Sequence, residues 1–150
     1  KTIELLKNRP AIEADPSVLG ERQFTLASAC ANLGLLNEAQ ESIEKALELD
    51  KLNPSYHQML ASILQARNMN QEAMDRLQRV LFLDPDNVMA NVTLGTIQSS
   101  LRNHTEALRH MRNAMKLLDQ LSSEEIVPDS DGATAAHIKE MVQSAIQNMT

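Results

Sequence analysis

Three strings repeat one pattern at a fixed spacing: "NEAQESIEKAL" (37–47), "QEAMDRLQRVL" (71–81) and "TEALRHMRNAM" (105–115). Each string contains a Glu-Ala pair, and the pairs recur every 34 residues, at 38–39, 72–73 and 106–107. Upstream of each pair, a leucine followed by a small residue keeps the same step, at Leu26, Leu60 and Leu94. A period of about 20–50 residues is typical of a solenoid of stacked repeats. The spacing therefore predicts three tandem repeats.

The composition points to an all-α protein that does not bind nucleic acid. Hydrophobic residues make up 43% of the 150 residues but aromatic residues only 2%, so the core must be built from Leu, Ala, Met and Ile. The net charge of −6 disfavours nucleic acid and anionic membranes as partners. No apolar span is long enough to insert into a membrane. The single cysteine, Cys30, excludes an internal disulfide and favours a cytoplasmic location.

Helix-breaking and helix-capping residues divide the chain into elements. Pro85 cannot lie inside a helix, and Asp86 or Asn87 can cap the helix that follows it. We expect repeats at 20–53, 54–87 and 88–121, preceded by an N-terminal leader (1–19) and followed by an acidic linker (122–132) and a C-terminal capping helix (133–150). Helices are expected at about 17–33, 36–50, 54–67, 70–83, 87–101, 104–121 and 133–148, with a short leader helix at 2–8.

The repeats resemble the tetratricopeptide repeat (TPR) family, whose pattern has 34 residues with a Leu-Gly pair and a later Ala. The Leu-small and Ala positions match in all three repeats, whereas the aromatic positions do not, and the closing proline remains only as Pro85. The resemblance implies an all-α solenoid of three helix-turn-helix repeats. It also implies that Leu94-Gly95 lies where the first helix of its repeat is crossed closely by the second, with Ala107 facing the same crossing.

In TPR arrays the first helices line a concave groove that binds a protein segment. In this chain those helices are nearly uncharged after their opening turns, whereas the second helices carry most of the charge. By the resemblance, the partner-binding groove residues are Phe24, Ser28, Asn32, Gln58, Ser62, Gln65, Met89, Val92, Thr96 and Ser99. Position nine of each repeat is a residue with a hydroxyl group: Ser28, Ser62 and Thr96. These side chains either form hydrogen bonds to a bound protein segment or are small so that the superhelix can curve.

The same positions argue against one TPR function and against catalysis. Clamping a peptide carboxylate requires paired Lys, Arg or Asn side chains, and only Asn32 is of that type. No nucleophile-base pair, metal-ligand spacing or phosphate loop is present, so we expect no catalytic residue, no metal and no cofactor. Cys30 is interpreted as a core residue. Asn91, Asn103 and Asn148 begin glycosylation sequons, which we interpret as chance matches.

A narrower resemblance covers residues 79–142. The run "RNAMKLLDQLSSEEIVPDSDGATAAHIKEMV" (112–142) is similar to the C-terminal TPR region of bacterial CheR-type chemotaxis receptor methyltransferases. Asn91 departs from the aromatic or His of that family. The resemblance rests on five short matches: Arg112-Asn113-Ala114, Leu117-Leu118, Val127-Pro128, Asp131-Gly132 and Thr134-Ala135. It implies that this non-catalytic chain docks a chemoreceptor or another signalling protein, as part of a parent enzyme that methylates glutamates with S-adenosylmethionine.

Two alternatives remain open. Residues 37–50 carry five acids and one base, and residues 102–116 four bases and one acid, so weak head-to-tail homo-oligomerisation is the first. The second is an intracellular secretion chaperone. The apolar stripe of the last helix (Ile138, Met141, Val142, Ala145, Ile146 and Met149) is expected to cover the end of the solenoid, or else to bind a partner.

Overall fold

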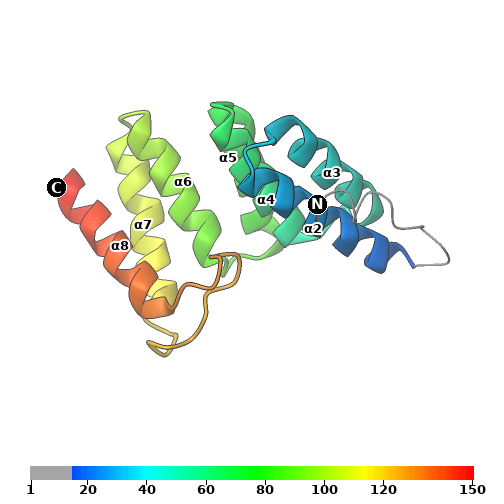
Figure 1. The fold of residues 1–150 in the computed structure, drawn as a ribbon. Helices are drawn as coiled ribbons and strands as arrows, with labels where there is room; N and C mark the ends of the chain where they lie inside the picture. Colours follow the sequence, from blue (N-terminus) through cyan, green and yellow to red (C-terminus); the bar gives the residue numbers. More distant parts are fainter. Residues whose placement is uncertain (1–14) are drawn as a thin grey trace. The chain divides into compact units, whose positions relative to one another are not determined.

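The computed structural model describes residues 15–150, which form seven α-helices and no β-strand (Figure 1). The predicted all-α fold is confirmed, and each expected helix begins and ends within three residues of an observed one. The expected leader helix at 2–8 lies outside the described residues. The helices are α2 (Pro16–Asn32), α3 (Leu36–Leu49), α4 (Pro54–Ala66), α5 (Asn70–Leu83), α6 (Val88–Ser100), α7 (His104–Leu118) and α8 (Ala135–Met149).

The 34-residue period reappears in the backbone of the turns. Gly34, Asn68 and Arg102 follow the first helices and have φ of 76°, 61° and 61°. One residue later, a backbone N–H closes each turn onto the preceding helix, from Leu35 to Cys30, Met69 to Leu64 and Asn103 to Gln98, at 2.8–2.9 Å. This left-handed residue satisfies carbonyls at the helix end and directs the chain into the second helix. The repeat is therefore present in the geometry of the chain as well as in its sequence.

A second recurring turn starts α4 and α6. Asn53 caps α4 by accepting a hydrogen bond from Tyr56 N at 3.3 Å, and Asn87 caps α6 by accepting one from Ala90 N at 2.9 Å. The amide nitrogens of both caps donate to an aspartate three residues earlier, Asp50 or Asp84. The sequence allowed either Asp86 or Asn87 to cap this helix, and the structure shows that Asn87 does so.

The chain divides into two compact units at the Arg76–Leu77 bond, which lies within α5. In the first unit α2 packs against α3, and α3 packs against α4. Tyr56 on α4 stacks on Phe24 of α2, with ring centroids 5.4 Å apart. A Cβ on Gly20 would lie 2.9 Å from the Tyr56 hydroxyl, so the glycine makes room for this ring. The two aromatic residues hold α2 and α4 together.

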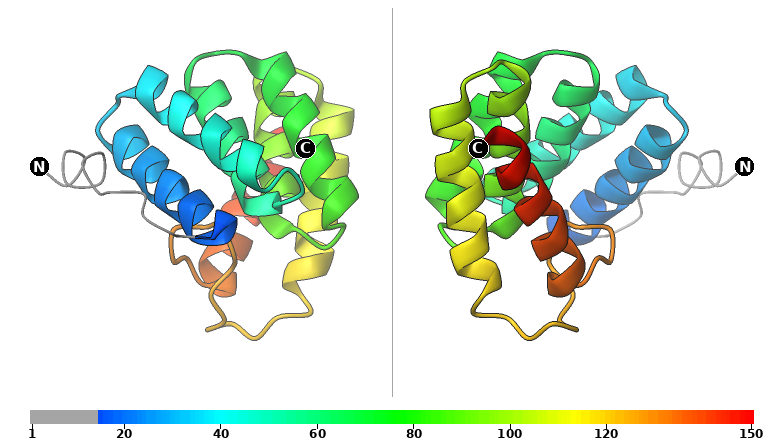
Figure 2. Two further views of the ribbon diagram at one scale, coloured as in Figure 1. Left: turned by 90° about the vertical axis from the view of Figure 1, so that its right-hand side faces the viewer. Right: turned by 90° about the vertical axis from the view of Figure 1, so that its left-hand side faces the viewer.

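In the second unit α7 packs against both α6 and α8, and Figure 2 shows α8 lying alongside α7. The core of this unit is formed by Val88, Val92, Met111, Ala114, Leu118, Val127, Ala135, Ile138 and Val142. The predicted close approach at Gly95 is confirmed, because a Cβ there would lie 2.9–3.1 Å from three atoms of Met111. The nearest neighbours of that position belong to Met111, however, and not to Ala107, which is itself fully buried.

The apolar stripe of α8 is narrower than expected. Ile138 and Val142 are buried in the core, but Met141 is 48% exposed. Its Cα is adjacent to that of Val142 and therefore about 100° away around the helix, so its side chain lies at the edge of the stripe. The prediction of one continuous stripe is wrong at Met141.

Within the segment that joins α7 to α8, residues 122–134 are held by a network of hydrogen bonds. Ile126 and Thr134 form an isolated antiparallel bridge, and Val127 N donates to Ala133 O at 2.9 Å. Ser130 ties the tip together, donating from Oγ to Val127 O at 2.6 Å and accepting from Ala133 N at 3.0 Å. Val127 is only 1% exposed. The acidic segment expected as a linker is thus anchored to the core of the second unit.

Candidate protein-binding surface

The predicted groove residues of the first unit lie on α2 and α4, carry no charge and differ in exposure. Asn32 and Ser62 are exposed, and Phe24, Ser28 and Gln65 are half-buried. Gln58 is only 5% exposed. Phe24 is partly buried because Tyr56 stacks on it. This stacking was not predicted, because the TPR pattern places no groove residue at position 56. Burial raises the pKa of the Tyr56 phenol, with further contributions from Asp50 and Glu21.

In the second unit, Thr96 on α6 is exposed, whereas Met89 and Ser99 are half-buried. Val92 is 7% exposed and belongs to the core cluster. Two of the recurring hydroxyls donate to their own helices: Ser62 Oγ to Gln58 O at 3.2 Å and Thr96 Oγ1 to Val92 O at 2.9 Å. A hydroxyl oxygen keeps its lone pairs in such a bond, so both side chains can still accept hydrogen bonds from a guest.

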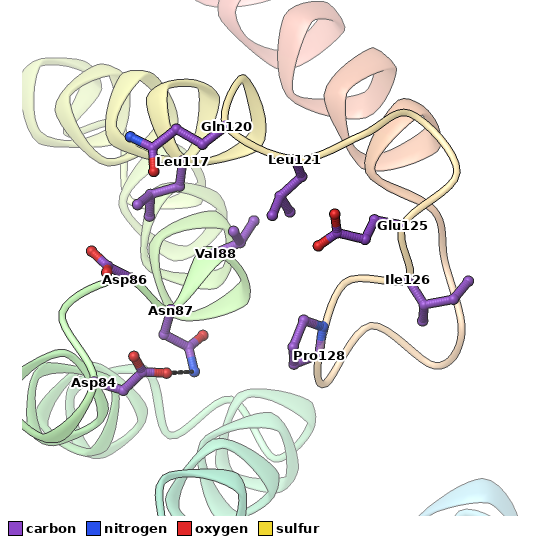
Figure 3. Close-up of a pocket in the computed structure, with 10 residues that line it drawn as sticks. All are labelled: Asp84, Asp86, Asn87, Val88, Leu117, Gln120, Leu121, Glu125, Ile126 and Pro128. Atoms are coloured by element: carbon purple, nitrogen blue, oxygen red, sulfur yellow. Dashed lines mark hydrogen bonds between the residues drawn. The ribbon is translucent and has the colours of Figure 1, made fainter.

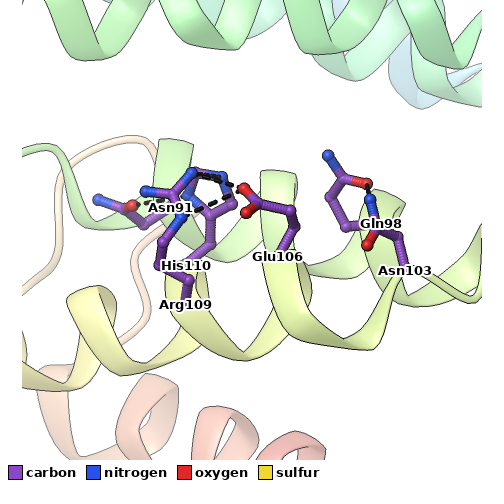
Figure 4. Close-up of polar contacts among 6 residues, drawn as sticks. All are labelled: Asn91, Gln98, Asn103, Glu106, Arg109 and His110. Atoms are coloured by element: carbon purple, nitrogen blue, oxygen red, sulfur yellow. Dashed lines mark hydrogen bonds and ion pairs between the residues drawn. The ribbon is translucent and has the colours of Figure 1, made fainter.

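A buried polar contact joins α6 to α7 behind this surface (Figure 4). His110 Nδ1 donates to Asn91 Oδ1 at 3.2 Å, and Asn91 Nδ2 donates to Asn87 O at 3.2 Å. Arg109 Nη2 lies 3.4 Å from His110 Nε2 and donates to Glu106 at 2.7 Å. Burial, with the Arg109 charge as the second cause, lowers the pKa of His110. The lowered pKa favours the neutral imidazole, and the contact with Asn91 Oδ1 requires the proton to be on Nδ1.

The pairing with His110 explains why an amide can stand at position 91, where the CheR-type resemblance leads one to expect an aromatic residue or His. Asn91 is only 3% exposed and both ends of its amide are engaged, which closes this sequon to modification in the folded chain. Cys30 is fully buried, as interpreted from the sequence.

Within residues 15–150, no group of three or more His, Cys, Asp and Glu side chains lies close enough together to hold a metal ion. No helix in the same range has the length and apolar character needed to cross a bilayer.

Comparison with known proteins identifies one of the repeats. Residues 21–51 match the family model described as tetratricopeptide repeat. A stretch of 77 residues is 39% identical to sperm-associated antigen 1 of Mus musculus. That match covers 51% of this chain and only 8% of the relative's length.

Solved structures share the fold over nearly the whole chain. The type III secretion translocator chaperone SycD of Yersinia enterocolitica superposes with a TM-score of 0.76 at 14% identity, covering 93% of this chain and 96% of that one. The same chaperone in complex with a peptide of the translocator YopD gives a TM-score of 0.74 at 15% identity, with the same coverage. The Arabidopsis OM64 TPR domain gives 0.68 at 21% identity, covering 86% and 98%. The chain has an all-α fold of the TPR type.

Proposed function

We propose that the chain is a non-catalytic protein-interaction scaffold that binds a segment of another protein on its first helices. The observation that carries this proposal is the repeated exposure of small, uncharged polar side chains on α2, α4 and α6, at Asn32, Ser62 and Thr96. Ser62 and Thr96 hold the same position in successive repeats, and their acceptor oxygens, like that of Asn32, suit the backbone N–H groups or polar side chains of a bound segment. Few Trp, Tyr or Arg anchors are present, so we expect micromolar affinity, about −8 kcal/mol.

Site-directed photo-crosslinking followed by charge substitution tests this surface. A photoreactive residue at Ser62 or Thr96 should capture a protein from a lysate of the source cells, and the captured protein would then be purified. The double variant Ser62→Arg plus Thr96→Arg should fold normally and reduce its affinity at least tenfold in calorimetry. Gln78→Arg plus Gln143→Arg adds the same charge at exposed positions of α5 and α8 and should bind normally. Equal affinity of both double variants would refute the proposal.

The likeness of residues 79–142 to the CheR-type family supports a more specific proposal, in which the scaffold docks a chemoreceptor or signalling protein for a receptor methyltransferase. The test has two parts, the sequence directly upstream of Lys1 and the transfer of labelled methyl groups from S-adenosylmethionine by the complete protein. A methyltransferase domain and labelled receptor glutamates are expected. Another kind of domain upstream would refute the link and leave the scaffold proposal intact.

Self-association is the second candidate, and Phe82 favours it because 85% of this large apolar residue is exposed. A pocket of about 310 Å³ is lined by Leu81, Pro85, Asn91, Asn113, Lys116 and Leu117. Phe82 of one copy could fill this pocket on another copy. Light scattering should show a concentration-dependent oligomer that Phe82→Ser abolishes. A wild-type monomer at millimolar concentration would rule this candidate out.

A further inference from the structure

A pocket in the second unit is lined by none of the predicted groove residues and has a different chemistry. It has a volume of about 330 Å³ and lies between the turn before α6, the end of α7 and residues 125–128 (Figure 3). This volume is at the lower end of the range typical of ligand pockets, about 300–1,000 Å³. The lining residues are Asp84, Asp86, Asn87, Val88, Leu117, Gln120, Leu121, Glu125, Ile126 and Pro128.

The walls of this pocket are apolar and held in place. Val88 belongs to the core cluster, and Leu117 and Leu121 pack against that cluster. Pro128 lines the opposite side, where Ile126 is 55% exposed and its side chain points away from Val88 in Figure 3. Two backbone hydrogen bonds fix this wall, from Val127 N to Ala133 O at 2.9 Å and from Ala135 N to Glu125 O at 2.8 Å. A guest therefore meets a preformed surface, which lowers the entropy cost of binding.

The charges around the pocket all have one sign. Three carboxylates, Asp84, Asp86 and Glu125, line it, and its ten lining residues include no Lys, Arg or His. Figure 3 shows the Glu125 carboxylate directed into the pocket, toward Leu121. Asn87 Nδ2 holds Asp84 by donating to Oδ2 at 3.3 Å, while the same Asn87 caps α6. Two of the carboxylates thus approach the pocket from opposite sides.

We propose that this pocket binds a basic-aliphatic segment of a partner protein, in which an Arg or Lys lies next to Leu or Ile. The aliphatic side chain would pack between Val88, Leu121 and Pro128. The cationic group would lie between Asp84 and Glu125, because opposite charges attract strongly where water is partly excluded. An acidic segment would place like charges beside these carboxylates, and a purely apolar segment would leave them with no cationic partner, only the hydrogen bonds from Asn87 and Ser122. This site is independent of the surface on the first helices and goes beyond the function proposed above.

The test uses two six-residue peptides at 150 mM salt, where charges beyond about 8 Å are screened. The probe is acetyl-Ala-Arg-Leu-Arg-Leu-Ala-amide, and the control peptide replaces arginine by citrulline, which is neutral and of similar shape. In ¹H–¹⁵N NMR titrations the arginine peptide should shift the amides of Val88, Leu121 and Ile126. It should bind at least tenfold more tightly than the citrulline peptide.

Two double variants distinguish binding at the pocket from nonspecific attraction to the acidic chain. Asp84→Asn plus Glu125→Gln keeps the size of both side chains and one acceptor oxygen in each, and should weaken the arginine peptide at least tenfold. Asp129→Asn plus Asp131→Asn removes the same amount of charge from the loop that carries Glu125, at positions that do not line the pocket, and should change the affinity less than twofold. Asn also tolerates the positive φ of those two residues. Thermal unfolding would verify that both variants are folded.

The proposal would be overturned by equal affinity for the two peptides, by equal loss in the two double variants, or by no shifts at the pocket at millimolar peptide. Shifts confined to Ser62 and Thr96 would also overturn it, while favouring the surface on the first helices. Ser62→Arg plus Thr96→Arg should leave the arginine peptide's affinity unchanged. The failure of either proposal is therefore distinguishable from the failure of the other.

Discussion

Replacing Gly95 by alanine tests how closely α6 and Met111 of α7 approach each other. The added Cβ would lie 2.9 Å from Met111 Cε, 3.0 Å from Cγ and 3.1 Å from Sδ. Carbon atoms in favourable contact are about 3.5–4.0 Å apart. Met111 is 3% exposed and must therefore move within a packed core. The terminal methyl group can rotate away, but Cγ is close to the backbone and has less freedom.

Two opposing effects set the size of the change. Alanine is favoured over glycine inside a helix by about 1 kcal/mol. Overpacking a core costs about 1–3 kcal/mol. We expect the overpacking to win, with a net loss of about 1 kcal/mol in the free energy of unfolding. In a Met111→Ala background the obstructing atoms are absent, so Gly95→Ala should instead gain about 1 kcal/mol there, the helix-propensity term alone.

Urea unfolding followed by far-UV circular dichroism measures all four chains of this cycle. Met111→Ala alone should lose about 2–5 kcal/mol. The expected coupling between the two positions is about 2 kcal/mol, well above the deviation of about 0.5 kcal/mol seen between independent sites. Equal effects of Gly95→Ala in both backgrounds would refute the close approach. Unchanged m-values are needed for the comparison, because they show that the unfolded states are similar.

Three further predictions concern single side chains. Asn87→Ala should destabilise the chain by about 1–2 kcal/mol, and more than Asn53→Ala in urea unfolding, because its cap bond is shorter and more buried. The pKa of His110 is lowered in the folded chain, so the unfolded chain binds a proton at this side chain more readily. The free energy of unfolding should therefore fall as the pH decreases below about 6.5, and His110→Gln should flatten this dependence. Ser130→Ala should cost about 1 kcal/mol and speed hydrogen exchange at Val127 N and Ala133 N.

The repeat period was the most predictable feature because it is set by local chemistry. Turn residues with positive φ, capping Asn and Asp side chains, and Leu-small pairs act within a few positions of themselves. The 34-residue spacing of the sequence therefore recurs in the structure. Positive φ is found at Gly34, Asn68 and Arg102, and helix caps are found at Asn53 and Asn87. Helix ends were predictable to within three residues for the same reason.

The exposure of individual groove positions was less predictable, because it depends on segments that pack from outside the repeat. Val92 and Thr96 lie one turn apart on α6, and the repeat pattern treats both as groove residues. Val92 is buried, in a cluster that includes Val127 and Val142 from beyond the third repeat. Thr96 is exposed. A pattern of 34 residues contains no information about an additional helix or loop, so it could not separate these two positions.

The loop at 122–134 shows how composition can mislead about order. Its Ser, Asp, Glu, Pro and Gly residues are typical of a solvated linker. The same residue types also make compact loops: Ser130 bonds to the backbone on both sides of the tip, and Asp129, Asp131 and Gly132 adopt positive φ. Val127 then anchors the loop in the core. Because the anchored loop brings Glu125 and Pro128 opposite Asp84 and Val88, the acidic pocket exists only through residues outside the three repeats. A preference of this pocket for basic segments would therefore depend on the loop and α8 that follow the repeats. It would not be a general property of the repeat.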